Sequence, residues 1–170
     1  MLVGLLCAGV AHADERSAAA VEVFSKSCLP GPPDFSAIDA KATAGKLEVD
    51  KDVSMPLPPG QSAHSKSWHA KFDDGGAYDL VAAEARSPSR DSASCGIGVE
   101  GVDRETLKRE LIKTLNLTTA ASENSSPDGE RHMTAWKYGT GMTLLLTDGT
   151  APAGIPGLYL SLIYQKTSSH

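Results

Sequence analysis

Several features that would identify a function directly are missing from this sequence. Its 170 residues contain no clustered run of lysine and arginine, and 16 basic against 21 acidic residues give a formal net charge of −5. A basic surface is typical of proteins that bind nucleic acid or anionic membranes, so neither partner class is expected. No apolar run approaches the roughly 20 residues that a membrane-spanning helix needs. We therefore expect no nucleic-acid partner and no stable membrane anchor.

Catalytic and metal-binding motifs are also missing. The chain has no GxSxG nucleophile elbow, and His64 and His69 lie five residues apart without forming an HExxH motif. The cysteines lack CxxC spacing. The acidic turn 73–76, DDGG, lacks the spacing of an EF-hand loop and is typical of a hairpin turn. We expect no metal ion and no cofactor, and we favour a non-enzyme, with a hydrolase whose site is assembled only in space as the alternative.

One literal match to a cofactor motif does occur. Residues 96–101 read GIGVEG, the GxGxxG spacing that places a dinucleotide phosphate on the amides of a helix start. The preceding segment 92–95, SASC, is not the buried apolar strand that such a motif follows, and a polar loop replaces the parallel strand expected after the helix. We interpret these glycines as positions where a strand twists and turns.

The first thirteen residues, MLVGLLCAGVAHA, predict an export signal. A short apolar run ends in the small-x-small pattern Ala11-His12-Ala13. We expect residues 1–13 to be removed and residues 14–170 to form a single domain. The mature chain then keeps two cysteines, Cys28 and Cys95, and an even count in an exported chain favours one disulfide bond between them; two buried free thiols are the alternative. The predicted location is the periplasm or the exterior.

Apolar periodicity predicts three helices and about six strands. The chain is organised around residues 95–117, where a short strand turns into an amphipathic helix with Leu107, Leu111 and Leu115 on one side. Two earlier helices are expected over 14–27 and 34–44, while 47–67 and 118–130 are expected to be loops. The expected strands cover 67–72, 77–85, 95–99, 132–138, 142–147 and 158–166. This order, α-α-β-β-β-α-β-β-β, predicts an α+β domain whose antiparallel sheet of about six strands carries helices on one face.

Two stretches of the sequence look alike. WHAKFDDGGAYDLV and WKYGTGMTLLL each combine a tryptophan-bearing strand, a glycine turn and an apolar strand, which indicates a faint internal duplication. The layout is similar to that of the β-lactamase inhibitor proteins, which also repeat a helix-and-strands unit, but no sequence motif is shared. The apolar start, the early cysteine and the later Cys-Gly strand resemble small secreted proteins of Gram-negative bacteria without an assigned function.

The remaining candidates for function are surface residues. Four polar residues on the two tryptophan-bearing strands are expected to lie on the outer face of the sheet and to form a binding surface. They are His69, Lys71, His132 and Lys137. We expect a non-catalytic binding module for another protein or an envelope component, of the inhibitor or immunity type, that is a monomer or a weak dimer. A periplasmic hydrolase is the alternative.

Overall fold

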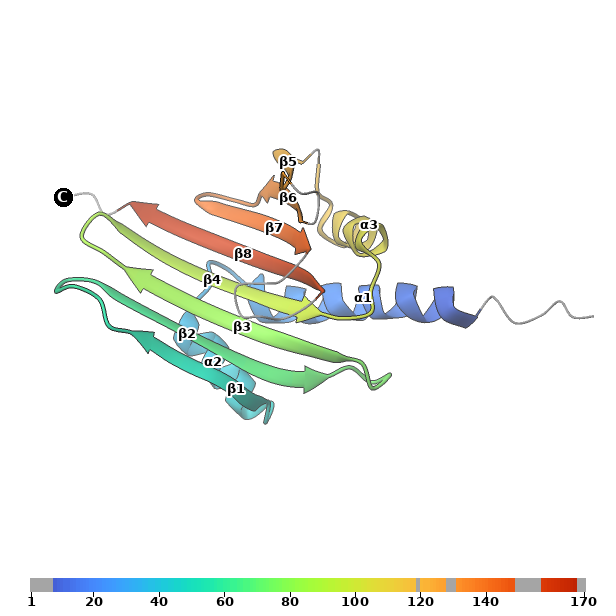
Figure 1. Cartoon of the computed structure of the whole chain (residues 1–170), viewed down its shortest axis with the longest axis horizontal. Coiled ribbons are helices and arrows are strands. Elements are labelled where there is room, and N and C mark those ends of the chain that lie inside the picture. The colour runs from blue at the N-terminus through green and yellow to red at the C-terminus, as the bar shows by residue number, and fades with distance from the viewer. Residues whose placement is uncertain (1–7, 119, 128–130, 149–156, 168–170) are drawn as a thin grey trace, which may run out of the picture.

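The computed structural model describes residues 8–118, 120–127, 131–148 and 157–167, which form an α+β domain (Figure 1). Eight antiparallel strands make one sheet in the order β1-β2-β3-β4-β8-β7-β6-β5. The elements in chain order are α1 (Ala8–Cys28), α2 (Phe35–Ala44), β1 (Glu48–Met55), β2 (Ser62–Lys71), β3 (Ala77–Arg86), β4 (Arg90–Val99), α3 (Arg104–Leu115), β5 (Ser122–Ser125), β6 (His132–Lys137), β7 (Met142–Asp148) and β8 (Leu158–Thr167).

The expected sheet of about six strands is wrong, because the two edge strands were expected to be loops. Every residue of β1 and of β5 is exposed, so neither strand shows the alternation of apolar and polar residues that marks a half-buried strand. The prolines that predict a loop begin at Pro56, one residue after β1 ends. An edge strand tolerates such a neighbour because one of its sides has no partner strand.

The core lies between the helices and one face of the sheet. A row of side chains in register crosses the central strands, and its members are at most 3% exposed. In spatial order, this row is Trp68, Leu80, Ile97, Leu160 and Leu146. Since side chains alternate between the two faces of a strand, the residues next to these in sequence lie on the opposite face.

All three helices attach to the face that carries this row. The disulfide bond between Cys28 and Cys95 joins the end of α1 to β4, where Cys95 lies two residues from Ile97. The Nζ of Lys66 on β2 lies 2.7 Å from the Asp39 carboxylate of α2. Arg104 of α3 donates a hydrogen bond of 2.8 Å to Thr134 on β6, whose register partner is Leu146. In the described residues, the opposite face is therefore formed by strands alone.

Helix α1 has a clear physical basis for its position. Its buried side chains lie at intervals of one, three or four residues and make one mostly apolar stripe that packs on β4, β8 and α3. These are Ser17, Ala20, Val21, Phe24 and Cys28. The expected export boundary at residue 13 falls inside α1, and residues 1–7 lie outside the described residues. No described helix is long and apolar enough to cross a bilayer.

The predicted disulfide bond is confirmed. The Cα atoms of Cys28 and Cys95 lie 5.3 Å apart, and both residues are buried at 2% and 0% exposure. A bond of this kind forms and persists mainly in oxidising compartments. It also ties the helical layer to the middle of the sheet, because β4 and β8 are the two central strands.

The sheet has two halves of similar layout that meet where β4 pairs with β8. Each half is a meander of four strands, β1–β4 and β5–β8, and each follows a helix. Trp68 on β2 lies opposite Leu80 on β3, and Trp136 on β6 lies opposite Leu144 on β7. The same tryptophan–leucine pair thus occupies the second and third strands of both halves, which supports the internal duplication.

Candidate functional site

The four residues of the predicted binding surface do not form one site. His69 lies on the face of the sheet without helices, and Lys71 lies at the end of β2, where it borders a cleft between α1 and the β2–β3 turn. Lys137 is the last residue of β6 and has the opposite orientation to Trp136. Because four strands separate β2 from β6, these side chains lie about 24 Å apart at the usual strand spacing.

The expected position of His132 is wrong. His132 and Trp136 are four residues apart on one strand, so the two-residue period puts both side chains on the helix-bearing face. There the Nδ1 of His132 lies 3.0 Å from Oδ2 of Asp148 on β7, and Nη1 of Arg104 on α3 lies 3.5 Å from the same oxygen. This cluster holds the start of α3 against the second half of the sheet.

Asp148 is the centre of that cluster. Partial burial acts to raise the pKa of Asp148, but the hydrogen bond from the His132 backbone N–H and the charges of Arg104 and His132 lower it below its ordinary value. With Arg104 also hydrogen-bonded to Thr134, each member has a structural partner. The arrangement fits a helix-docking role, because its contacts join Arg104 at the start of α3 to β6 and β7.

The other two described histidines of the sheet are also paired with aspartates on neighbouring strands. The Nε2 of His64 lies 2.7 Å from Oδ1 of Asp52, and the Nδ1 of His69 lies 2.9 Å from Oδ1 of Asp79. The hydrogen bond from His64 lowers the pKa of the Asp52 carboxyl below its ordinary value. Slight desolvation acts to raise this pKa but does not cancel the effect. Both pairs lie on the surface and link adjacent strands.

The strand-only face contains a groove at its centre, which we call the sheet groove. Its volume is about 330 Å³, and nine residues from β2, β3, β4, β7 and β8 line it. They are Ser65, Val81, Ala83, Ser94, Leu145, Thr147, Tyr159, Ser161 and Ile163. None of these side chains carries a formal charge, and hydroxyl groups alternate with alkyl groups. The sheet groove therefore suits an uncharged, mainly apolar ligand group that also accepts a few hydrogen bonds.

The floor of the sheet groove is low because small residues occupy the central strands. In register order, the row across its middle is Ser67, Val81, Gly96, Ser161, Leu145 and Ala135. A side chain on Gly96 would meet Tyr159, since a Cβ there would lie 2.6 Å from the phenol oxygen. The Tyr159 ring thus lies across the glycine, and burial raises the pKa of its phenol. Glycine at this position lets the tyrosine lie low in the groove.

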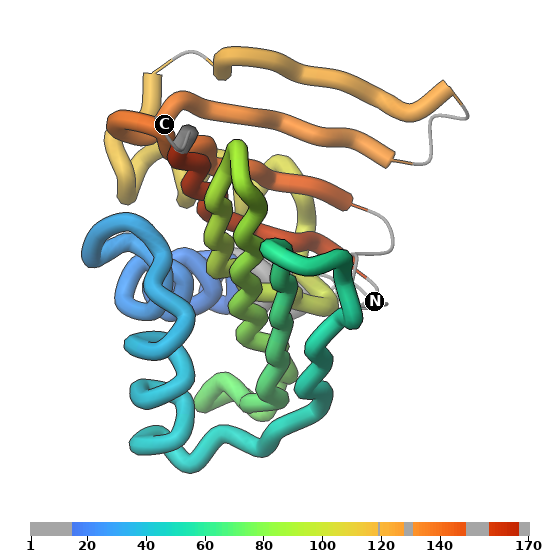
Figure 2. Tube along the Cα trace, turned by 90° about the vertical axis from the view of Figure 1, so that its left-hand side faces the viewer, coloured from blue at the N-terminus to red at the C-terminus, as the bar shows by residue number. Residues whose placement is uncertain are grey.

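Strong twist adds to this shape. In Figure 2, β3 and β4 run steeply through the view, whereas the orange strands β6 and β7 run across it. A sheet that turns this far between its halves cannot be flat at its centre. The groove lies where the two halves meet, since its lining comes from β2 to β4 and from β7 to β8.

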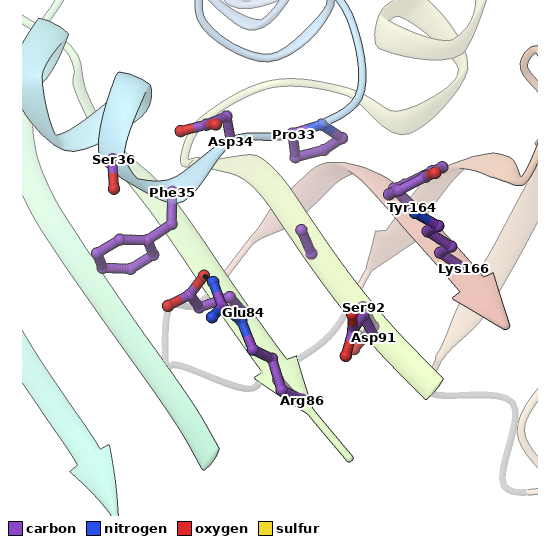
Figure 3. A pocket seen from close by; sticks show the side chains of 12 residues that line it. Pro33, Asp34, Phe35, Ser36, Glu84, Arg86, Asp91, Ser92, Tyr164 and Lys166 are labelled. Atoms are coloured by element: carbon purple, nitrogen blue, oxygen red, sulfur yellow. Dashed lines mark hydrogen bonds and ion pairs between the residues drawn. The ribbon is translucent and has the colours of Figure 1, made fainter. Parts of the chain in front are cut away.

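A second hollow, polar in character, lies on the helix-bearing face at the end of the sheet beyond α2 (Figure 3). Its volume is about 350 Å³. The close-up shows Glu84 and Arg86 from β3 beside one another, and their side chains form an ion pair of 3.5 Å. Asp34 is occupied as the N-cap of α2, where it accepts a hydrogen bond of 2.8 Å from the Ala37 N–H. Because its charges of both signs are partly paired, this hollow shows no marked ligand preference.

A hydrolase, the alternative function, would need catalytic side chains such as histidine in one of the hollows. Two further clefts, of about 400 and 200 Å³, lie beside α1 and beside the α1–α2 turn. None of these four hollows is lined by a histidine. In the described ranges, no three His, Cys, Asp or Glu side chains are grouped so that they could share a metal ion.

The GxGxxG stretch lies in a context that does not suit a dinucleotide. Gly96 and Gly98 belong to β4, and their neighbouring strands β3 and β8 are both antiparallel to it. Gly101 follows in the turn with a φ of 69°, and a Cβ there would lie 2.7 Å from Nη1 of Arg16. The interpretation of these glycines as twist and turn positions therefore agrees with the geometry.

The sheet groove was missed at the sequence level, although a signal for it exists. On β3, β4 and β8 the alternation of buried residues leaves small or uncharged residues on the other face too, such as Ala83, Ser94 and Ser161. A solvated sheet face normally carries charged residues. The low charge of both faces was therefore the sequence signal that could have predicted the sheet groove.

In comparisons with known proteins, no family model, no curated protein and no solved structure matches this chain.

Proposed function

We propose that this chain is an exported, non-catalytic binding module that holds an uncharged, apolar segment of a partner protein in the sheet groove. The observation that carries the proposal is the central face of the sheet that no described helix covers, with a groove of about 330 Å³ lined by nine residues without formal charge. Grooves of this volume accommodate side chains of a partner or a small ligand. A non-catalytic module that binds another protein in this way would act as an inhibitor or an immunity protein.

A protein partner is favoured over an anionic envelope lipid by the chemistry of the lining. Lipid phosphates and the acidic groups of glycolipids are bound by arginine and lysine, and the sheet groove has neither. Its hydroxyl groups on Ser65, Ser94, Thr147, Tyr159 and Ser161 instead suit backbone amides and carbonyls beside apolar side chains. Export is part of the same proposal, and the Cys28–Cys95 bond supports it, because such bonds form and persist mainly in oxidising compartments.

The test places a charge in the groove. Leu145→Glu and Ile163→Glu put a carboxylate among apolar groups, where a bound apolar segment would have to bury it. The matched control is Lys26→Glu on α1, whose side chain is 74% exposed. Binding of the uncharged dye Nile red is followed by its fluorescence. We expect both groove variants to bind the dye with an apparent affinity at least tenfold lower than the wild type, while the control binds it as the wild type does.

A photo-crosslinking experiment then addresses the partner. Thr143 lies opposite Ile163 on β7 and is exposed, so a benzophenone side chain introduced there reaches the groove without filling it. In a native periplasmic extract, we expect the labelled protein to form one stoichiometric adduct. We expect this adduct to disappear when the same chain also carries Leu145→Glu. An adduct that persists in this variant, or hydrolytic turnover by the purified protein that is lost in His69→Ala or His132→Ala, would contradict the proposal.

A further inference from the structure

The exposed apolar side chains of the described residues are concentrated at one edge of the sheet. All four large hydrophobic residues that are exposed fall between residues 49 and 57: Val49 at 51%, Val53 at 46%, Met55 at 53% and Leu57 at 42%. Three of them belong to β1, an edge strand that pairs only with β2. The opposite edge, β5, is four residues of Ser, Glu and Asn. The two edges therefore differ in their capacity to attract a partner.

An edge strand has a row of backbone N–H and C=O groups that no strand of its own sheet uses. In β1 this row is limited at both ends. A register shift between Val49 and Lys51 interrupts the ladder near the start, and Pro56 follows the last residue. The regular part is thus Lys51 to Met55, with the sequence KDVSM. Lys51, Val53 and Met55 point to the same face as the sheet groove, because they lie opposite Ser67, Ser65 and Ala63.

We propose that β1 is a dimerisation edge, which pairs antiparallel with β1 of a second copy about a two-fold axis at Val53. This register places Val53 opposite Val53, Lys51 opposite Met55 and Asp52 opposite Ser54. Two apolar side chains meet on the axis, and each methionine lies against the alkyl part of a lysine. No like charges oppose one another.

Neighbouring registers are less favourable. An axis at Asp52 places two aspartates in opposition, and an axis at Lys51 opposes two lysines as well as Asp50 and Asp52. An axis at Ser54 brings Pro56 opposite Asp52, inside the regular part of β1, where proline cannot donate to the ladder. At the Val53 axis Pro56 faces only Asp50, beside the register shift. In its own chain, the Asp52 carboxylate lies 2.7 Å from Nε2 of His64 and 3.7 Å from Nζ of Lys66. At the Val53 axis it faces the uncharged Ser54 of the second copy.

The strength of this pairing follows from its size. Five residues on each side make a contact well below the roughly 1,200 to 2,000 Å² of a stable interface. The dimer is therefore concentration-dependent, and its two strand-only faces join into one continuous surface across the axis. It uses the edge of the sheet and leaves the groove free, so it stands independently of the function proposed above.

Cysteine crosslinking tests the register directly. In the proposed dimer the two Cβ atoms at position 53 lie about 4.5 to 5.5 Å apart, which allows a disulfide bond after slight adjustment. Val53→Cys should form a covalent dimer on mild oxidation, as seen on a non-reducing gel. In the matched control Met55→Cys, the two cysteines are offset by four residues, about 13 Å, and should not crosslink. Equal crosslinking of both variants, or none in Val53→Cys, would overturn the proposal.

Charge substitutions give a second measurement that needs no cysteine. Val53→Lys places two lysines on the axis, whereas Ser54→Lys places a lysine opposite Asp52. By sedimentation equilibrium, we expect the wild type to self-associate as concentration rises, Val53→Lys to remain monomeric, and Ser54→Lys to associate at least as strongly as the wild type. Far-UV circular dichroism verifies that each variant is folded. A wild type that stays monomeric into the millimolar range, or a crosslink from Val53→Cys to a different protein in native extract, would refute self-pairing.

Discussion

At the scale of single residues, Gly96 sets the depth of the sheet groove. A Cβ at this position would lie 2.5 Å from the backbone oxygen of Leu160 and 2.6 Å from the phenol oxygen of Tyr159. The strand and the tyrosine must both shift to admit a methyl group. We expect Gly96→Ala to lower the free energy of unfolding by about 1 to 3 kcal/mol, the usual cost of overpacking.

Urea denaturation measures this effect, and Gly31→Ala is the matched control. Gly31 has no atom within 4 Å of an added Cβ, so its substitution should leave stability nearly unchanged. If Gly96→Ala were as stable as Gly31→Ala, Tyr159 would not lie across the glycine as described. Nile red binding should also fall in Gly96→Ala, because a displaced tyrosine ring changes the shape of the groove.

Residue-level prediction from the sequence succeeded where chemistry restricts the choice. Residues 14–170 contain two cysteines, which leave one possible intramolecular pair, and Cys28 and Cys95 do form it. It failed for His132, although the four-residue spacing to Trp136 already places both on one face. Tyr159 was missed because its role depends on Gly96 of another strand, and register between distant strands is not written in either segment.

At the scale of elements, Asp148 links β7 to the start of α3. Arg104 and the backbone and side chain of His132 keep the pKa of Asp148 below its ordinary value despite partial burial. A carboxyl with a depressed folded-state pKa stabilises the fold fully above its unfolded pKa of about 3.9, and this contribution disappears as the pH falls through the folded pKa. We therefore expect Asp148→Asn to cost about 1 to 2 kcal/mol at pH 7 and much less near pH 2.

Chemical denaturation of both proteins between pH 7 and pH 2 measures this difference. Asp103→Asn is a useful comparison, because asparagine is also a good N-cap and can still accept the hydrogen bond from the Thr106 N–H at the start of α3. A stability gap between wild type and Asp148→Asn that stays constant down to pH 2 would show that Asp148 acts by packing and not by charge.

The elements that the sequence predicts well are those with a buried face. The stripe containing Leu107 and Leu111 correctly predicts α3, which in the structure begins after the N-cap residue Asp103. Strands β1 and β5 bury no side chain, so their pairing depends on the exposed edge of a sheet that other segments build. Propensity alone does not distinguish such an edge from a loop.

At the scale of the whole molecule, the arrangement of the sheet follows from joining two similar halves. Local sequence predicts the hairpins β2–β3 and β6–β7, because in each a glycine-containing turn separates a tryptophan-bearing strand from an apolar strand. The pairing of β4 with β8 joins residues as far apart as Arg90 and Thr167. Its position in the centre, and with it the groove where the halves meet, depends on long-range packing that no local pattern specifies.

The disulfide bond stabilises this whole arrangement, since it fixes the end of α1 to a central strand. Cys28 and Cys95 are 67 residues apart, and closing a loop of that length contributes about 4 kcal/mol in the chain-entropy model. We expect Cys28→Ala/Cys95→Ala to lose about this much stability and, because β4 contacts both halves of the sheet, to unfold in one cooperative transition. Reduced wild-type protein serves as the control, because it keeps both buried sulfur atoms. Similar losses in the two proteins would assign the effect to the cross-link, whereas a loss confined to the alanine variant would assign it to the packing of the sulfur atoms beneath α1.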